Sequence, residues 1–266
     1  MTPRHVNLPV TPNRDLGQHF LVDENILGVA GRLAELERED VVLEVGAGLG
    51  VLTAFLADRV RLVHAVELDR SLEPHLRARL VGRTNVELVF GDALRLPLHE
   101  LDPPPAKLVA NLPYQIATPL VAESLGTLPA LRLWCVLVQR EVADRFFAPA
   151  GTKSYGAVSV LVRLTAERIG AHAVARTCFA PPPNVDSALL AFRRIRDWGP
   201  ELLRVREVVQ AAFAHRRKTL ANSLELAGLA GREQAVAALD ELGRPAGVRA
   251  EALEPAELLR LAELLP

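Results

Sequence analysis

Cysteine is scarce in this sequence of 266 residues, and neither Cys135 nor Cys178 lies in a CxxC pair or at metal-ligand spacing from a histidine. Two such residues cannot supply a disulfide framework or a cysteine-rich zinc site. Long apolar runs are also missing, since none reaches the ~18 residues that cross a bilayer. The opening stretch, MTPRHVNLPVTPNRD, has no apolar centre of a signal peptide. We therefore expect a cytoplasmic protein with no membrane contact and no metal requirement.

An overall excess of positive charge is missing as well, because the formal net charge is −1. This value by itself argues against a protein coated in basic surface for nucleic acid. The distribution is uneven, however: from Arg193 to Lys218 eight basic residues stand against three acidic ones. Such a local excess attracts phosphate groups, although a solvated helix face is the alternative explanation.

Half of the residues are hydrophobic, which is enough for a sizeable core. Over the first two thirds of the chain, short β-rich runs alternate with segments whose apolar spacing suits helices. The β-rich runs are residues 41–45, 61–67, 86–90, 107–111 and 133–138. This alternation predicts a Rossmann-like α/β fold, with a mostly parallel sheet and crossover helices.

The next part of the chain predicts the edge of that sheet and a domain boundary. A helix is expected over 156–169, and the runs 169–175 and 187–194 then flank the loop FAPPPNVD and are expected to pair as antiparallel edge strands. Gly-Pro in DWGP, residues 197–200, ends regular structure. The remainder predicts four short amphipathic helices, at 201–215, 217–228, 232–243 and 255–265. We expect two domains, 1–197 and 198–266, the second all-α.

A glycine loop, LEVGAGLG at 43–50, comes where the first strand should turn into a helix. Glycines there let the backbone approach a nucleotide closely, and the helix N-terminus supplies N–H groups. Glu67 ends the second strand 21 residues after Gly46, where an acid can accept both hydroxyls of a ribose. Asp92, in GDA after the third strand, is placed to receive an adenine amino group. A purely structural turn is the alternative for the glycines alone.

The glycine spacing separates dehydrogenases from methyltransferases, two classes of enzyme that both bind an adenosine at the ends of successive strands. Gly46, Gly48 and Gly50 form GxGxG, whereas the dinucleotide fingerprint is GxGxxG. A cofactor with an adenosine but no pyrophosphate fits better, which favours S-adenosylmethionine over a nicotinamide dinucleotide. A nicotinamide dehydrogenase stays as the disfavoured alternative.

The segment NLPY, residues 111–114, follows the apolar run at 107–110. Methylation of an exocyclic adenine amine needs the nitrogen held in line with the methyl group. The side-chain oxygen of Asn111 and the carbonyl of Leu112 can accept its two N–H bonds. Pro113 restricts Leu112 to an extended conformation, and Tyr114 offers a flat face to an unstacked base. A surface turn with a packed tyrosine is the alternative.

Taken together, these motifs resemble those of the KsgA family of ribosomal RNA adenine dimethyltransferases. The resemblance runs from about Leu16 to the C-terminus, through LGQHFLVDENIL, LEVGAGLGVLT, VELDRSL, GDAL, VANLPYQIATPL, QREVADR, KSYGAVSVL, FAPPPNVDSALL and AFAHRRKTLANSL. It implies an enzyme that dimethylates N6 of two adjacent adenosines near the 3′ end of small-subunit (16S) ribosomal RNA, with S-adenosylmethionine as cofactor, during ribosome biogenesis. The implied partner is this RNA or a pre-assembled small subunit, and a monomer is expected.

The resemblance also implies roles for individual residues. The first domain would be catalytic and the second would bind RNA through Arg216, Arg217 and Lys218. The residues implied around the cofactor are Gln18, His19, Leu21, Gly46, Gly48, Glu67, Leu68, Asp92, Ala93 and Asn111. Those implied around the reacting base are Asn111, Leu112, Pro113, Tyr114 and Phe179, with Phe179 closing the base pocket opposite Tyr114.

Two residues depart from the family pattern, because relatives usually carry phenylalanine and asparagine where Leu16 and His19 stand. His19 is either a cofactor-side donor or a tolerated substitution. Upstream, only Arg4 and Arg14 carry a fixed positive charge, so this stretch is expected to add little to RNA binding.

Two further alternatives stay open at this point. One is an erythromycin-resistance-type methylase of large-subunit RNA, against which the FAPPPNVDS and HRRKTLANSL segments count. The other is an RNA-binding assembly factor without catalytic activity, against which Asn111, Pro113 and Tyr114 count.

Overall fold

The computed structural model describes residues 8–13 and 15–266, so that Arg4 and Arg14 lie outside the described residues. The chain divides into two compact units. The first comprises residues 1–143 and 168–194, and the second comprises residues 144–167 and 195–266. Among the described residues, no helix has the length and apolar character needed to cross a membrane.

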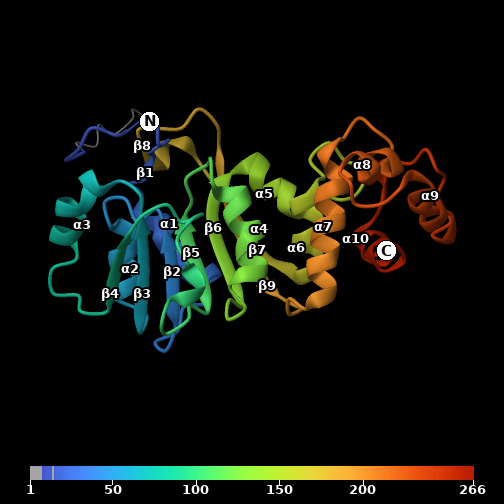
Figure 1. Cartoon of the computed structure of the whole chain (residues 1–266). Coiled ribbons are helices and arrows are strands. Elements are labelled where there is room, and N and C mark those ends of the chain that lie inside the picture. The colour runs from blue at the N-terminus through green and yellow to red at the C-terminus, as the bar shows by residue number, and fades with distance from the viewer. Residues whose placement is uncertain (1–7, 14) are drawn as a thin grey trace. The chain divides into compact units, whose positions relative to one another are not determined.

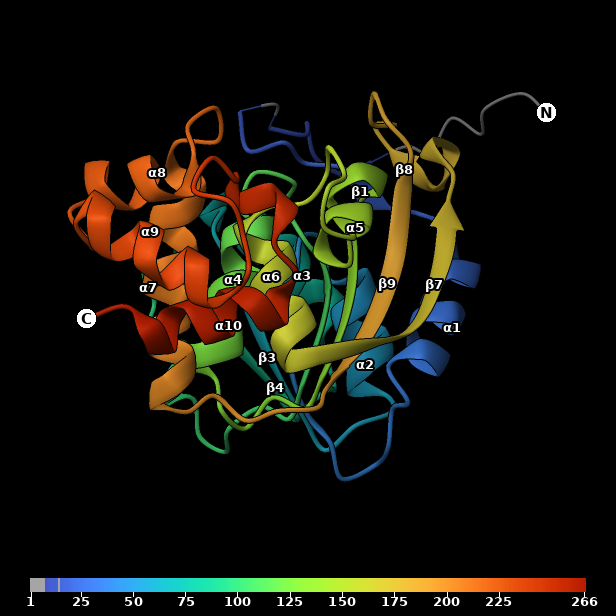
Figure 2. The ribbon, with the colours of Figure 1, turned by 90° about the vertical axis from the view of Figure 1, so that its right-hand side faces the viewer.

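The first unit is built on a seven-stranded sheet with the order β4-β3-β2-β5-β6-β9-β7 (Figure 1). Its strands are β2 (Val41–Val45), β3 (Leu62–Glu67), β4 (Val86–Phe90), β5 (Lys107–Asn111), β6 (Leu133–Gln139), β7 (Ala166–Val174) and β9 (Ser187–Arg194). Strands β2 to β6 are parallel to one another, whereas β9 runs antiparallel to β6. Figure 2 shows β9 and β7 side by side at one edge. The predicted fold class is confirmed.

The helices of this part of the chain are α1 (Glu24–Leu33), α2 (Val51–Ala57), α3 (Glu73–Arg79), α4 (Ala117–Thr127) and α5 (Arg140–Phe146), with the 3-10 turns η1 (Arg70–Leu72), η2 (Leu98–Glu100) and η3 (Arg176–Cys178). The predicted helix over 156–169 is too long. The helix α6 (Ala157–Thr165) ends where β7 begins, because residues 166–169 extend to form part of the edge strand. Pairing with a distant strand overrides local helix propensity there.

A second, two-stranded sheet was not expected from the sequence. Strand β1 (Phe20–Leu21) pairs antiparallel with β8 (Phe179–Ala180), in the register Phe20↔Ala180 and Leu21↔Phe179. The pairing fastens the GQHFL segment to the FAPPP loop, although about 160 residues separate them in the chain.

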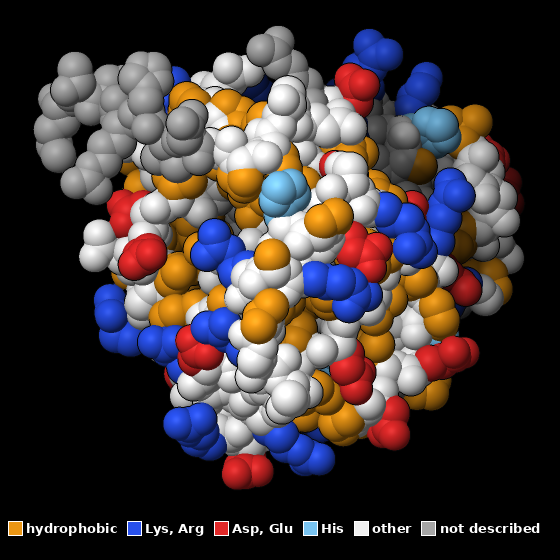
Figure 3. Space-filling model, turned by 90° about the vertical axis from the view of Figure 1, so that its left-hand side faces the viewer, with side chains coloured by type: hydrophobic (Ala, Val, Ile, Leu, Met, Phe, Trp, Pro, Cys, Tyr) orange, Lys and Arg blue, Asp and Glu red, His pale blue; other side chains and the backbone are white. Residues whose placement is uncertain are grey.

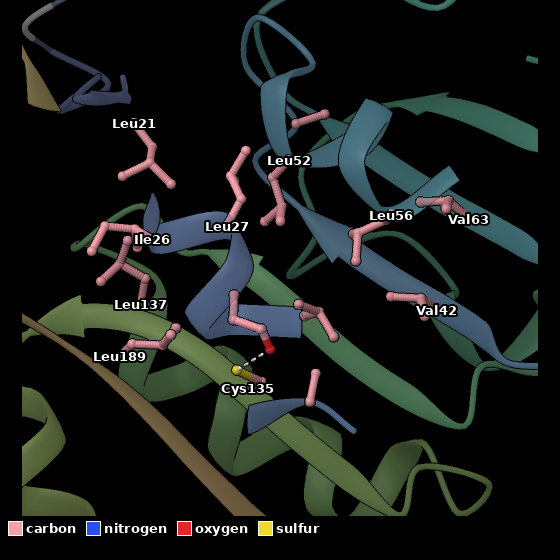
Figure 4. Packing of buried hydrophobic residues seen from close by; sticks show 14 of the residues in the cluster. Leu21, Ile26, Leu27, Val42, Leu52, Leu56, Val63, Cys135, Leu137 and Leu189 are labelled. Carbon is pink, nitrogen blue, oxygen red and sulfur yellow. Dashed lines mark hydrogen bonds between the residues drawn. The ribbon is translucent and has the colours of Figure 1, made fainter. Parts of the chain in front are cut away.

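The main hydrophobic core of the first unit lies between α1, α2 and the sheet. Leu27, Leu52 and Leu56 point toward Val42 and Val63 of the sheet, and Leu21, Ile26, Leu137 and Leu189 fill the neighbouring space (Figure 4). Cys135 is fully buried here, with its Sγ 3.6 Å from the carbonyl oxygen of Ala30. As expected from the sequence, this cysteine is a packing residue.

The second unit is helical, with α6 (Ala157–Thr165), α7 (Pro200–Ala214), α8 (Leu220–Leu226), α9 (Arg232–Glu241), the 3-10 turn η4 (Ala250–Ala252) and α10 (Pro255–Leu264). The hydroxyl of the buried Tyr155 donates to the carbonyl of Leu253 at 2.8 Å, and its ring meets the edge of Phe213. Helix α6 therefore packs with the C-terminal helices, whereas the sequence-based boundary at 197 placed it in the first domain. After residue 199, the helices α7, α9 and α10 match the predicted ones to within two residues at each end. Helix α8 (Leu220–Leu226) is shorter than the predicted helix at 217–228, and Arg217 and Lys218 lie in the turn before it.

Candidate functional site

A cleft opens at the carboxyl ends of β2, β3, β4 and β5 in the first unit. Open α/β sheets bind ligands at this end of their strands. Twelve of the residues that the sequence places around a cofactor or base line it: Gln18, His19, Gly46, Gly48, Glu67, Leu68, Asp92, Ala93, Asn111, Leu112, Pro113 and Tyr114. These come from five separate segments, which the parallel strands bring to one edge.

The glycine loop forms the floor of the cleft. Gly46, Gly48 and Gly50 have φ values of +82°, +57° and +75°, a conformation that favours glycine. A Cβ on Gly46 would lie 3.0 Å from the ring of Pro113, and one on Gly48 would lie 3.2 Å from the ring of Phe20. Side chains here would crowd these two rings in a backbone conformation that glycine alone adopts without strain, so the loop is bare backbone.

Glu67 ties this loop to the next strand. Its carboxylate accepts the backbone N–H of Gly48 at 2.7 Å and that of Asp69 at 2.8 Å. Burial raises the pKa of Glu67, while the N–H groups of Asp69 and Gly48 oppose the rise. Each carboxylate oxygen keeps a second acceptor site, which is what binding of a ribose diol requires.

A second acid lies in the neighbouring strand. Glu44, in β2, is 1 % exposed, and burial raises its pKa to about 8. This shift favours the neutral form of Glu44 at pH 7.

Residues before β1 cover one side of the cleft. Gln18 donates from Nε2 to Asp69 at 2.7 Å, and Asp69 also accepts the hydroxyl and amide of Ser71. The hydrogen bonds from Ser71 and Gln18 lower the pKa of Asp69. After the end of β4, Asp92 accepts the backbone N–H of Leu94 at 3.0 Å, and this hydrogen bond closes the turn.

The NLPY segment forms the remaining wall. The Nδ2 of Asn111 donates to the backbone carbonyl of His19 at 3.2 Å, so its Oδ1 is the atom left to accept a hydrogen bond from a ligand. The amide of Leu112 donates to the carbonyl of Leu137 at 3.1 Å, which fixes the turn onto β6. The phenol oxygen of Tyr114 lies 2.8 Å from Ser187 Oγ, and its ring lies 5.7 Å from that of His19.

Two of the expected site residues lie elsewhere. Leu21 and Phe179 are 7 % and 3 % exposed and belong to the hydrophobic core, not to the lining of the cleft. The cause is the β1–β8 pairing, which sets the two residues opposite each other. The ring of His19, a residue that the sequence suggested for the cofactor side, lies beside Tyr114 instead, with 5.7 Å between the ring centroids.

Sequence reasoning missed three residues that hold the site together. Phe20 packs over Gly48, Asp69 receives Gln18, and Ser187 bonds to Tyr114. Asp69 and Ser187 each lie inside a motif already singled out, VELDRSL and FAPPPNVDS, so position within a motif was the available signal.

The three basic residues proposed for RNA binding belong to the second unit and differ from one another. The Nη2 of Arg216 donates to the carbonyls of Tyr155 and Lys153 at 3.0 and 3.4 Å and pairs with Glu251 at 3.3 Å. The side chains of Arg217 and Lys218 are exposed and have no such partner within the described part of the chain. Figure 3 shows a face of the molecule on which acidic and basic side chains are interspersed.

Comparison with known proteins shows which chains this one is similar to. The model of the family described as "Ribosomal RNA adenine dimethylase" matches residues 10–265. The chain is 45 % identical over 263 residues to ribosomal RNA small subunit methyltransferase A of Rubrobacter xylanophilus, covering 98 % of each protein. It is 43 % identical to the protein of the same name from Kineococcus radiotolerans, covering 97 % of this chain and 88 % of that one.

Two solved structures resemble the fold. A dimethyladenosine transferase from Plasmodium falciparum matches with a TM-score of 0.73 and 23 % identity, over 91 % of this chain and 96 % of that one. The 23S rRNA methyltransferase ErmE matches with a TM-score of 0.65 and 32 % identity, over 92 % of this chain and 99 % of that one.

Proposed function

The chain belongs to the ribosomal RNA adenine dimethylase family, and from this premise we infer that it dimethylates the N6 amine of adenosines in small-subunit ribosomal RNA. It is an enzyme, and its methyl donor is S-adenosylmethionine. The observation that carries this function is the adjacency, in one cleft, of a bare glycine loop, the Glu67 carboxylate and the free oxygen of Asn111. Within this RNA, we propose that the methylated residues are two adjacent adenosines near the 3′ end.

The residues of the cleft fit this cofactor. The positive φ values at Gly46 and Gly48, and the crowding that a Cβ would meet there, favour glycine at both positions. Without side chains, the backbone of the loop is open to a ligand. We propose that Glu67 accepts the ribose hydroxyls, that Asp92 accepts the adenine amine and that Leu68 and Ala93 pack on the purine. The bound cofactor supplies a sulfonium-activated methyl group.

The base side follows from the orientation of Asn111. Its Oδ1 and the carbonyl of Leu112 accept the two N–H bonds of the target amine and hold the nitrogen in line with the methyl group. Tyr114 provides the platform for an unstacked adenine, since stacking on an aromatic ring is worth ~1 to 3 kcal/mol per base. Burial raises the pKa of Tyr114, so the phenol is neutral at the pH of the reaction.

A direct test uses separated, unmodified ribosomal subunits and labelled S-adenosylmethionine. We expect label in small-subunit RNA, as dimethyladenosine at two adjacent positions. Label only in large subunits would overturn the assignment. It would favour methylation of large-subunit RNA, the activity of the structurally similar 23S rRNA methyltransferase ErmE. Free small-subunit RNA, assayed beside assembled subunits, distinguishes the two forms of substrate. We further propose that the enzyme acts as a monomer in the cytoplasm.

We propose that the second unit binds RNA phosphates through Arg217 and Lys218. Because Arg216 is committed to Lys153, Tyr155 and Glu251, its role is to hold the segment that carries the other two. Replacement of Arg217 and Lys218 by alanine is expected to weaken binding to small subunits. It should also flatten the salt dependence of binding by up to ~0.9 log units per lost contact.

The matched control is Arg216→Ala. We expect this variant to melt at a lower temperature, whereas the double variant melts like the wild type and binds cofactor with unchanged affinity. Binding isotherms over a salt series and thermal unfolding measure both effects. A folded double variant with an unaltered salt slope would show that Arg217 and Lys218 do not contact phosphate.

A further inference from the structure

Ser187 lies directly behind the tyrosine of the NLPY segment. It is the first residue of β9, is 1 % exposed and pairs with Gln139 of β6. Its Oγ and the phenol oxygen of Tyr114 lie 2.8 Å apart, within hydrogen-bond distance. Because β6 and β9 pair over their whole length, the position of this hydroxyl is fixed by the sheet.

His19 holds the same tyrosine from another side. The ring centroids of His19 and Tyr114 lie 5.7 Å apart with an angle of 30° between the planes. The Nδ1 of His19 lies 2.8 Å from the carbonyl oxygen of Pro181, and since a carbonyl can only accept, this nitrogen donates. The imidazole is thus fastened to the loop that leads into β9.

These two contacts constrain different degrees of freedom of the ring. A tyrosine side chain has two rotatable bonds before its hydroxyl. An anchor at the hydroxyl fixes the direction of the ring axis, and packing of a neighbouring ring restricts rotation of the ring plane about that axis. A platform held in both respects has less freedom to lose when a base stacks on it.

We propose that Ser187 is a positioning residue for methyl transfer, which orients Tyr114 as the platform for the target adenine. This inference rests on the proposed role of Tyr114. Ser187 does not line the cleft and acts only through the phenol oxygen. Its effect therefore falls on the RNA substrate and on turnover, while the cofactor contacts at Glu67 and the glycine loop are untouched.

A double-mutant cycle tests the proposal, because Ser187→Ala and Tyr114→Phe delete the two ends of one hydrogen bond. We expect each single variant to lower kcat/KM for RNA about three- to tenfold, the scale of one neutral hydrogen bond. The double variant should lose no more than either single one, since the same interaction is removed once. The affinity for S-adenosylmethionine should not change in any of the three.

A readout without substrate complements the kinetics. The chain has two tyrosines, so two signals are expected from tyrosine labelled with ¹³C at Cζ. Ser187→Ala should shift the Tyr114 signal and leave that of Tyr155 in place. Ser124→Ala is the matched control, because this buried hydroxyl bonds to Val121 and Trp134 away from the cleft. It is expected to lower the melting temperature without changing turnover.

The outcomes separate the inference from the function on which it rests. Wild-type kinetics in Ser187→Ala or Tyr114→Phe, or losses that add in the double variant, would overturn the positioning role. If Ser187→Ala did not fold, Tyr114→Phe alone would decide, since it breaks the same bond from the cleft side. If even Tyr114→Ala kept full activity, the platform itself, and with it the proposed base site, would be refuted.

Discussion

Asn111→Ala is expected to lower turnover about a hundredfold or more, which is the scale for deleting a preorganised polar group that acts in the transition state. The reason lies in the orientation of the amide. Its Nδ2 is engaged by the carbonyl of His19, which directs Oδ1 to the place where the target amine must lie. Alanine removes this acceptor at the moment when the nitrogen develops positive charge. Single-turnover transfer of labelled methyl groups measures the effect.

The expected loss belongs to the chemical step, so the affinity for S-adenosylmethionine, measured by calorimetry, should change much less. Asn111→Asp provides a comparison, because a carboxylate keeps the acceptor but cannot donate to His19. We expect its turnover to lie between those of the wild type and the alanine variant. An alanine variant with normal turnover but weak cofactor binding would make Asn111 a cofactor ligand only.

Glu67→Ala is expected to weaken S-adenosylmethionine binding by at least ~1.5 to 3 kcal/mol, the scale for hydrogen bonds to a charged group. The structure adds a reason for a value at the upper end. The same carboxylate accepts the amides of Gly48 and Asp69, so its removal also frees the loop that forms the floor of the cleft. Glutamine should not rescue binding, because its amide N–H₂ would face one of these two donors.

Titration calorimetry on purified variants checks this prediction. Glu87→Gln is the matched control, since Glu87 is an acid of the neighbouring strand that pairs with His64 and does not line the cleft. Its cofactor affinity should equal that of the wild type. Unchanged affinity in Glu67→Ala would remove Glu67 from the site, and tight binding of a nicotinamide dinucleotide by the wild type would revive the dehydrogenase interpretation.

Much of the fold was predictable because the signals are local. All five predicted parallel strands match the observed ones to within one residue at each end, and β4 is among them although none of its residues is fully buried. The start of the edge strand was not predictable in the same way. Residues 166–169 continue an apolar pattern that suits a helix, and only the presence of β9 beside them makes an extended conformation favourable.

The cleft was predictable from the sequence for a related reason. Parallel strands present their carboxyl ends at one edge of a sheet. The residues at or just after these ends, among them Gly46, Glu67, Asp92 and Asn111, therefore had to come together once the sheet was recognised. Motif spacing then distinguished S-adenosylmethionine from a dinucleotide. Neither inference needs knowledge of any long-range contact other than the parallel pairing itself.

Only the tertiary structure decided which side chains face the cleft and which support it. The pairing of β1 with β8 buries Leu21 and Phe179 in the core and sets His19 against Tyr114, and the register of β9 on β6 places Ser187 behind the phenol. In the second unit, folding of α6 onto the C-terminal helices commits Arg216 to internal carbonyls and leaves Arg217 and Lys218 exposed. Each of these outcomes depends on contacts between residues far apart in the chain, such as Tyr114 and Ser187, which are 73 positions apart. The geometry of these contacts is set by strand register and helix packing, and neither leaves a periodic signal in the sequence.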